Sequence, residues 1–148
     1  MKANVAFTYC ADEIFSLVDA ETSRLGAFLR FPDGGSAYDT LKIHEKDKPV
    51  VYGLISDSFR TIQTRFTGEC EYYMNCKSHN LELYLPDFDV ELFDSASDEV
   101  RRYIVLSVTA RWLMARSFGE YAKMVAADSE ASMNRLVDML RTRKYPIE

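Results

Sequence analysis

The chain contains 148 residues, 47% of them hydrophobic and 13% aromatic, and its formal net charge is −5. This size and composition suit one packed domain, predicted over residues 1–148, and exclude a long disordered region. The acidic excess argues against a nucleic-acid binder, sequence-specific or general, and against binding to an anionic membrane surface, because both need an excess of Lys and Arg.

Targeting signals and cysteine usage indicate an intracellular setting. The first residues lack the apolar stretch of a secretory signal, and no window approaches the ~18 consecutive apolar residues that cross a bilayer. The three cysteines are an odd number in a domain that is large enough not to need disulfides. We therefore expect reduced thiols in a protein that is neither secreted nor embedded in a membrane.

The N-terminal third of the chain predicts one helix and then a long loop. Apolar residues recur at helical spacing over residues 12–28, where Asp12 is the expected N-cap. Residues 31–48 are polar and begin with a turn-forming segment, so we predict a loop with one helical turn near residues 38–41. A loop of this length is more often functional or mobile than idle.

The middle of the chain predicts a helix followed by a β-hairpin. The helix covers residues 49–67, with Asp47 as its N-cap. Residues 69–85 then alternate between apolar and polar side chains around a polar turn at residues 77–80, which is the pattern of a hairpin. The alternation places one set of side chains toward the helices. These are Cys70, Tyr72, Met74, Leu81, Leu83 and Leu85.

Two more helices are predicted in the C-terminal part, over residues 95–117 and 120–142. Ser95 begins a capping box for the first of them, and Trp112 lies in an almost unbroken apolar run that predicts a central helix. Arg111 interrupts that run, which favours an internal ion pair. These elements together predict a mainly helical bundle with one small β-hairpin packed on it.

Several groups of residues carry side chains of the kinds that catalytic and metal sites use. Cys70, Cys76 and His79 are too few and too widely spaced for a zinc site, and Cys10 has no His beside it in the sequence. The carboxylates of residues 87–99 fit a solvated edge and a helix N-terminus better than a paired-carboxylate enzyme. We therefore predict no catalytic residue, no metal site, no cofactor and no enzymatic activity.

The order of the predicted elements is itself informative. A helix is followed by a short hairpin, a connector with proline and acidic residues, an apolar helix, and a last helix with a basic end. The residues that carry this order are Asp47-Lys48-Pro49, Thr67-Gly68, Leu85-Pro86-Asp87-Phe88, Trp112, Arg116, Tyr121-Ala122, Met133, Leu136 and Leu140.

Between residues 47 and 146 the chain resembles the small head–tail connector (adaptor) proteins of tailed bacteriophages and prophages. The resemblance implies a helical bundle with a small β element and no enzymatic activity. It also implies a homo-oligomeric ring docked beneath the portal, with portal and tail-side proteins as partners. The protein would then be found in the bacterial cytoplasm during assembly and afterwards in the virion.

The C-terminal segment is the predicted contact surface of such a ring. It combines cations, an aromatic and an aliphatic side chain just after the last apolar turn, and Tyr and Arg are common interface anchors. A helix end that complements its dipole and a frayed terminus explain the same composition. A small cytoplasmic binding module or enzyme, with a site assembled from distant residues, is the alternative function. The predicted interface residues are Arg141, Arg143, Lys144, Tyr145 and Ile147.

Overall fold

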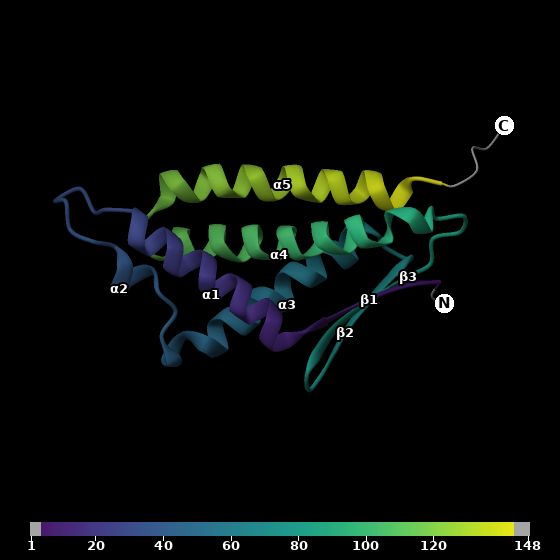
Figure 1. Cartoon of the computed structure of the whole chain (residues 1–148), viewed down its shortest axis with the longest axis horizontal. Helices are drawn as coiled ribbons and strands as arrows, with labels where there is room; N and C mark the ends of the chain where they lie inside the picture. Colours follow the sequence, from purple (N-terminus) through teal and green to yellow (C-terminus); the bar gives the residue numbers. More distant parts are fainter. Residues whose placement is uncertain (1–3, 144–148) are drawn as a thin grey trace.

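Four long helices and a three-stranded antiparallel sheet make up residues 4–143, the part of the chain that the computed structural model describes (Figure 1). The predicted mainly helical class is confirmed. The elements in chain order are β1 (Val5–Cys10), α1 (Ala11–Phe28), α2 (Tyr38–Leu41), α3 (Lys48–Arg65), β2 (Cys70–Asn75), β3 (Ser78–Leu83), α4 (Phe93–Ala115) and α5 (Gly119–Arg141), with 3₁₀ turns at Glu45–Asp47 and Val90–Leu92.

The helix boundaries lie within two residues of the predicted ones, but the predicted caps Asp12 and Ser95 are wrong. Strand β1 runs directly into α1, which therefore begins at Ala11 without a side-chain cap from Asp12. Helix α4 begins at Phe93, before Ser95, because a 3₁₀ turn leads into it. The cap of that turn is Asp89, whose carboxylate accepts the Glu91 N–H at 3.1 Å.

Asp47 is the residue that precedes α3, as predicted, but its side chain does not cap that helix. Its carboxylate accepts the backbone N–H of His44 at 3.1 Å and pairs with Arg116 at 3.3 Å. Asp47 therefore ties the end of the 31–48 loop to the end of α4 instead of stabilising the start of α3.

The sheet contains a strand that the hairpin prediction missed. The strand order is β1-β3-β2, so the N-terminal strand pairs with the second strand of the hairpin, from Val5 opposite Leu83 to Cys10 opposite Ser78. The inward residues of β1 are Val5, Phe7 and Tyr9, and all three are buried. One face of the sheet thus packs on the helices and the other faces solvent.

The hairpin turn is two residues closer to the N-terminus than predicted. Asn75 pairs with Ser78, which leaves Cys76 and Lys77 as the turn and places His79 inside β3. The predicted inward residues Cys70, Leu81, Leu83 and Leu85 are buried and Tyr72 is half-buried. Met74 is 45% exposed, contrary to prediction, because the far end of the hairpin extends past the helices (Figure 1).

Helix α4 lies at the centre, in contact with α5 on one side and with α1 and α3 on the other (Figure 1). Trp112 is 2% exposed, which confirms its place in the core, and its indole N–H donates to the Leu41 carbonyl at 2.7 Å. The guanidinium of Arg116 lies 4.0 Å from the Trp112 ring centre. The predicted internal ion pair of Arg111 is wrong, because this side chain is half-exposed and meets Asp57 at 3.6 Å on the surface.

Within residues 4–143, no helix combines the length and the apolar composition that a bilayer span requires.

Candidate functional site

The described part of the predicted C-terminal interface folds back onto its own chain. Arg141 ends α5, where its guanidinium pairs with Glu69 at 2.9 Å and lies 4.8 Å from the ring centre of Phe66. Arg143 approaches Asp87 at 3.8 Å and donates to the Pro86 carbonyl at 3.3 Å. Both arginines remain about half-exposed, so they stay accessible to a partner. The other predicted interface residues, Lys144, Tyr145 and Ile147, lie outside the described residues.

These contacts bring the end of α5 beside the connector that precedes α4. The backbone N–H of Asp89 donates to the Thr142 carbonyl at 3.3 Å, and Phe88 forms a β-bridge with Arg143. The cavity enclosed by Glu69, Leu85 and Arg141 measures about 30 Å³, which is room for one water molecule at most. This end of the molecule is therefore a surface and not a ligand pocket.

The residues weighed as nucleophiles or metal ligands do not come together. Cys10 and Cys76 are exposed, whereas Cys70 is buried and its pKa is raised to about 12 by burial. A thiol with that pKa stays protonated at neutral pH and is a poor nucleophile or ligand. Among residues 4–143, no three His, Cys, Asp or Glu side chains are grouped as a metal site requires.

His79 is fully buried between rings instead of lying in a turn. Its Nδ1 is 2.8 Å from the Tyr72 hydroxyl, and its ring stacks on Phe59 with the centroids 4.7 Å apart. Its Nε2 has no hydrogen-bond partner among the described residues, and burial lowers the pKa of the imidazole. The ring is therefore neutral at pH 7 and has no path to a substrate. The alternation of His79 with Leu81 and Leu83 was the sequence signal for this burial.

Glu99 is a buried carboxylate at the contact between α4 and α5. It accepts hydrogen bonds from the Ser132 hydroxyl at 2.6 Å and from Arg135 at 2.8 Å, with Arg102 at 3.9 Å. The sequence prediction grouped Glu99 with the solvated carboxylates. Its helical spacing from Ala96 and Tyr103, both buried, was the signal that it faces the core. Because these partners come from both helices, the carboxylate of Glu99 joins α4 to α5.

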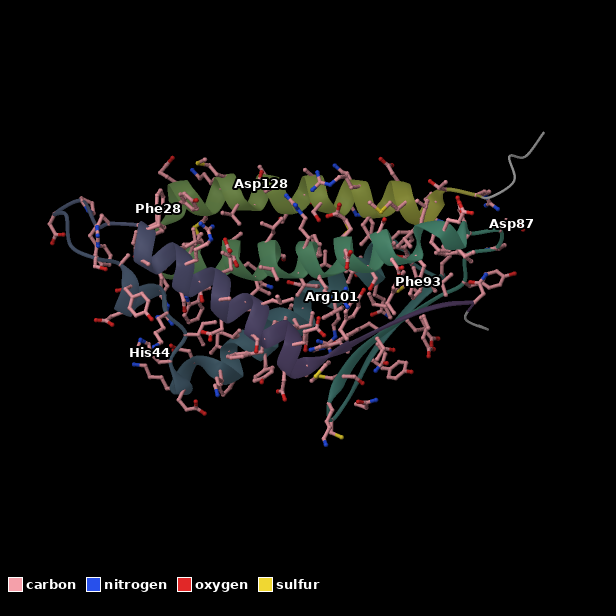
Figure 2. The ribbon with its side chains drawn as sticks, in the orientation of Figure 1. Phe28, His44, Asp87, Phe93, Arg101 and Asp128 are labelled. Carbon is pink, nitrogen blue, oxygen red and sulfur yellow. The ribbon has the colours of Figure 1, made fainter. Side chains whose placement is uncertain are left out.

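An open cleft of about 520 Å³ lies at the opposite end of α5, and we call it the aromatic cleft. Phe31 and Phe118 form one part of it, with ring centres 5.3 Å apart. Met124 is 65% exposed on its α5 side. Phe28, which is 67% exposed, ends α1 at the same end of the molecule (Figure 2). The residues that line the cleft are Arg30, Phe31, Pro32, Ser117, Phe118, Gly119, Glu120, Tyr121 and Met124.

Two tight turns build this cleft. Ser117 adopts φ 72°, which ends α4 and lets the Phe118 N–H donate to the Leu113 carbonyl at 2.9 Å. On the other wall, the Phe31 N–H donates to the Gly35 carbonyl at 2.8 Å across a turn in which Gly34 has φ 88°. Sequence reasoning missed the cleft because its walls are far apart in the chain and each reads as an ordinary turn.

The chain matches no model of a known protein family, no curated protein and no solved structure. A function for this chain is therefore supported only by its own residues and by the order of its elements.

Proposed function

We propose that this chain is a structural subunit of a tailed-phage or prophage particle, which forms or joins a head–tail connector ring beneath the portal. The observation that carries this proposal is the aromatic cleft. Exposed Phe28 and Met124 gather with the rings of Phe31 and Phe118 at one end of the bundle, and Arg30 and Glu120 supply the charged part of the lining. An exposed apolar patch with a polar rim is typical of a surface that binds another protein.

The elongated shape supports assembly as the function. The aromatic cleft lies at the first turn of α5, and the two arginines of the predicted interface lie just at and beyond its last turn. Twenty-three residues separate these surfaces by about 35 Å at 1.5 Å per residue. A subunit with different surfaces at its two ends is suited to head-to-tail contacts, and such contacts close into rings when the rotation permits.

The order of elements supports the choice of particle. Helix α3, the β2–β3 hairpin, the connector, and helices α4 and α5 follow one another in the order on which the resemblance to phage adaptors rests. The portal, the tail-side proteins and further copies of this chain are the proposed partners. The proposed location is the bacterial cytoplasm during assembly and the virion afterwards.

Mixing the protein with the portal from the same genome tests this proposal. We expect ring-shaped complexes in negative-stain images and a joint peak in size-exclusion chromatography. Full-length protein that stays monomeric or dimeric with the portal would contradict the connector role and favour the small binding module or enzyme.

Two variants locate the contact. Met124→Asp, in the aromatic cleft, should weaken co-assembly with the portal, whereas Met74→Asp places the same charge on the exposed far end of the hairpin and should leave co-assembly intact.

A chain ending at Leu140 tests the C-terminal interface, including Lys144, Tyr145 and Ile147. Equal assembly by the shortened and full-length chains would remove this segment from the contact while the ring remains.

A further inference from the structure

The connector between β3 and α4 presents an exposed aliphatic side chain at the end of the molecule opposite the aromatic cleft. Val90 is 67% exposed on the Val90–Leu92 turn. The bond from the Asp89 N–H to the Thr142 carbonyl fixes this turn beside the C-terminal end of α5. Figure 2 shows the neighbouring Asp87 and the cleft-side Phe28 at opposite ends of the molecule. Val90 therefore projects from a held position and not from a loose loop.

Two exposed carboxylates follow Val90 closely in the sequence. Glu91 is exposed and forms no ion pair among residues 4–143, and Asp94, also exposed, follows in the first turn of α4. Asp89 and Asp87 differ from them, because Asp89 caps the turn and Asp87 meets Arg143. We call Val90, Glu91 and Asp94 the acidic knob.

The aromatic cleft has the complementary composition. Its walls are mostly apolar, and its one carboxylate, Glu120, meets Lys123 at 3.9 Å. Arg30 on its rim is exposed and forms no ion pair among the described residues, so it is the unpaired charge of the cleft. An apolar hollow beside an unpaired cation complements an aliphatic side chain beside an unpaired anion in polarity and charge. Opposite potentials of this kind set the register and orientation of a contact.

We propose that the acidic knob of one copy docks in the aromatic cleft of a second copy. Val90 enters between Phe118 and Met124, and Glu91 pairs with Arg30. This inference rests on the proposed ring and names the contact between neighbouring subunits. One chain cannot make the contact with itself, because Met124 and Thr142 are separated by about 27 Å of helix. The two surfaces differ, so the contact is head-to-tail and each copy keeps one free surface for the next.

The contact is expected to be weak between two free copies. It consists of one aliphatic side chain and one solvent-exposed ion pair, and exposed ion pairs contribute little. Many copies held on a common ring would strengthen it through high effective concentration. The test must therefore detect a transient encounter.

Cysteine cross-linking provides such a test without any portal. In a Cys10→Ser, Cys76→Ser background, a Val90→Cys chain is mixed with a Met124→Cys chain and treated with a short bis-maleimide. We expect several-fold more heterodimer than for Val90→Cys mixed with Met74→Cys, since Met74 is exposed far from the cleft. A chain carrying both Val90→Cys and Met124→Cys should give a ladder of higher oligomers. Equal yields with Met74→Cys would overturn the proposal.

Charge reversal tests the pairing. Arg30→Glu in the Met124→Cys chain should reduce the cross-link several-fold, and Glu91→Arg in the Val90→Cys chain should restore it. Lys77→Glu changes the charge equally at the exposed hairpin turn and should have no effect. An unchanged yield with Arg30→Glu would overturn the Arg30–Glu91 pairing. Portal co-assembly without this cross-link would reject the knob contact alone, whereas the cross-link without portal co-assembly would reject the connector role alone.

Discussion

The contact between α4 and α5 buries the carboxylate of Glu99, and the contact between the sheet and α3 buries the imidazole of His79, but the two groups are accommodated in opposite ways. Glu99 lies between the two helices with a hydroxyl and two guanidinium groups around it. His79 lies under α3 among rings, with Phe59 on one face and a single hydrogen bond to Tyr72. At the contact between α4 and α5, hydrogen bonds and ion pairs compensate the burial of the Glu99 carboxylate. At the contact between the sheet and α3, the His79 imidazole is buried in its neutral form.

The difference follows from what each element can supply. Helix α5 carries Ser132 and Arg135 on the turn that faces Glu99, and the long arginine side chain reaches it from the rim. The sheet and α3 supply flat rings, and Phe59 stacks on Tyr72 at 5.2 Å as well as on His79. The stability of the α4–α5 pair should therefore depend on hydrogen bonds to the Glu99 carboxylate. The stability of the sheet on α3 should depend on the area that the packed rings bury.

The largest effect is expected where packed area is lost. Phe59→Ala removes a fully buried ring that contacts Tyr9, Tyr72 and His79, and should lower the free energy of unfolding by about 3–5 kcal/mol. Urea denaturation monitored by circular dichroism measures this loss. Phe28→Ala, at an exposed position, should change it by less than about 0.5 kcal/mol. A loss below about 1 kcal/mol for Phe59→Ala would mean that the rings do not hold the sheet.

A smaller effect is expected at the helix pair. Glu99→Ala removes the acceptor of two short hydrogen bonds, one of them from a guanidinium, and should cost about 2 kcal/mol. Asp98→Ala removes an exposed carboxylate paired with Arg101 and should cost less than about 0.5 kcal/mol. Equal losses for the two variants in thermal or urea unfolding would place Glu99 in a solvated environment.

The neutral state of His79 predicts a pH dependence. Burial lowers the pKa of the folded imidazole below its ordinary 6.5, so the unfolded chain binds the proton more readily. The contribution of His79 to stability is therefore fully present above pH 6.5 and is lost as the pH falls from there toward the folded pKa. The slope is limited to about 1.4 kcal/mol per pH unit.

Denaturation of the wild type and of His79→Phe at pH 7.5 and pH 5.5 isolates this contribution. The decrease in stability on acidification should be smaller by about 1 kcal/mol in His79→Phe, because its ring carries no titrating nitrogen. His44→Gln, which changes the exposed histidine, serves as the control. An identical decrease in wild type and His79→Phe would contradict the neutral, buried imidazole.

The smallest effect is expected at the far end of the hairpin. Met74→Ser should change the free energy of unfolding by less than about 0.5 kcal/mol, because this side chain is 45% exposed beyond the helices. Leu83→Ala at the other end of the same sheet should cost about 2–5 kcal/mol. Comparable losses for the two would show that α3 covers the whole hairpin.

Sequence patterns predicted the helices and the hairpin because those signals are local. Strand β1 also alternates, with Val5, Phe7 and Tyr9 inward, but its partner β3 follows only after α1, α2, α3 and β2 in the sequence. The turn was misplaced because Ser78 and His79 are polar and resemble turn residues. The burial of His79 depends on Phe59, which lies too far away in the sequence for a local pattern around His79 to include it.

The candidate surfaces were predictable to different degrees. The composition of residues 141–147 predicts an interface at one end of α5, and the structure adds the contacts of Arg141 and Arg143 there. The aromatic cleft was not predicted, since Phe31 and Phe118 meet only when α1 and α5 are both in place. Knob residues are exposed and cleft residues are exposed or half-buried. Periodicity predicts which side chains are buried more reliably than it predicts which surface side chains lie together.

The pairing of β1 with β3 has a consequence for synthesis on the ribosome. The pair Val5–Leu83 forms only after the whole segment through β3 has left the ribosome. Strand β1 therefore has no partner strand while α1 and α3 are synthesised. The β2–β3 hairpin, by comparison, closes across Cys76 and Lys77 within microseconds once both strands are available. During that interval β1 offers an open strand edge, and neighbouring nascent chains on a polysome present the same edge. Slow translation between residues 10 and 78 would lengthen the period in which this strand is open to misassembly.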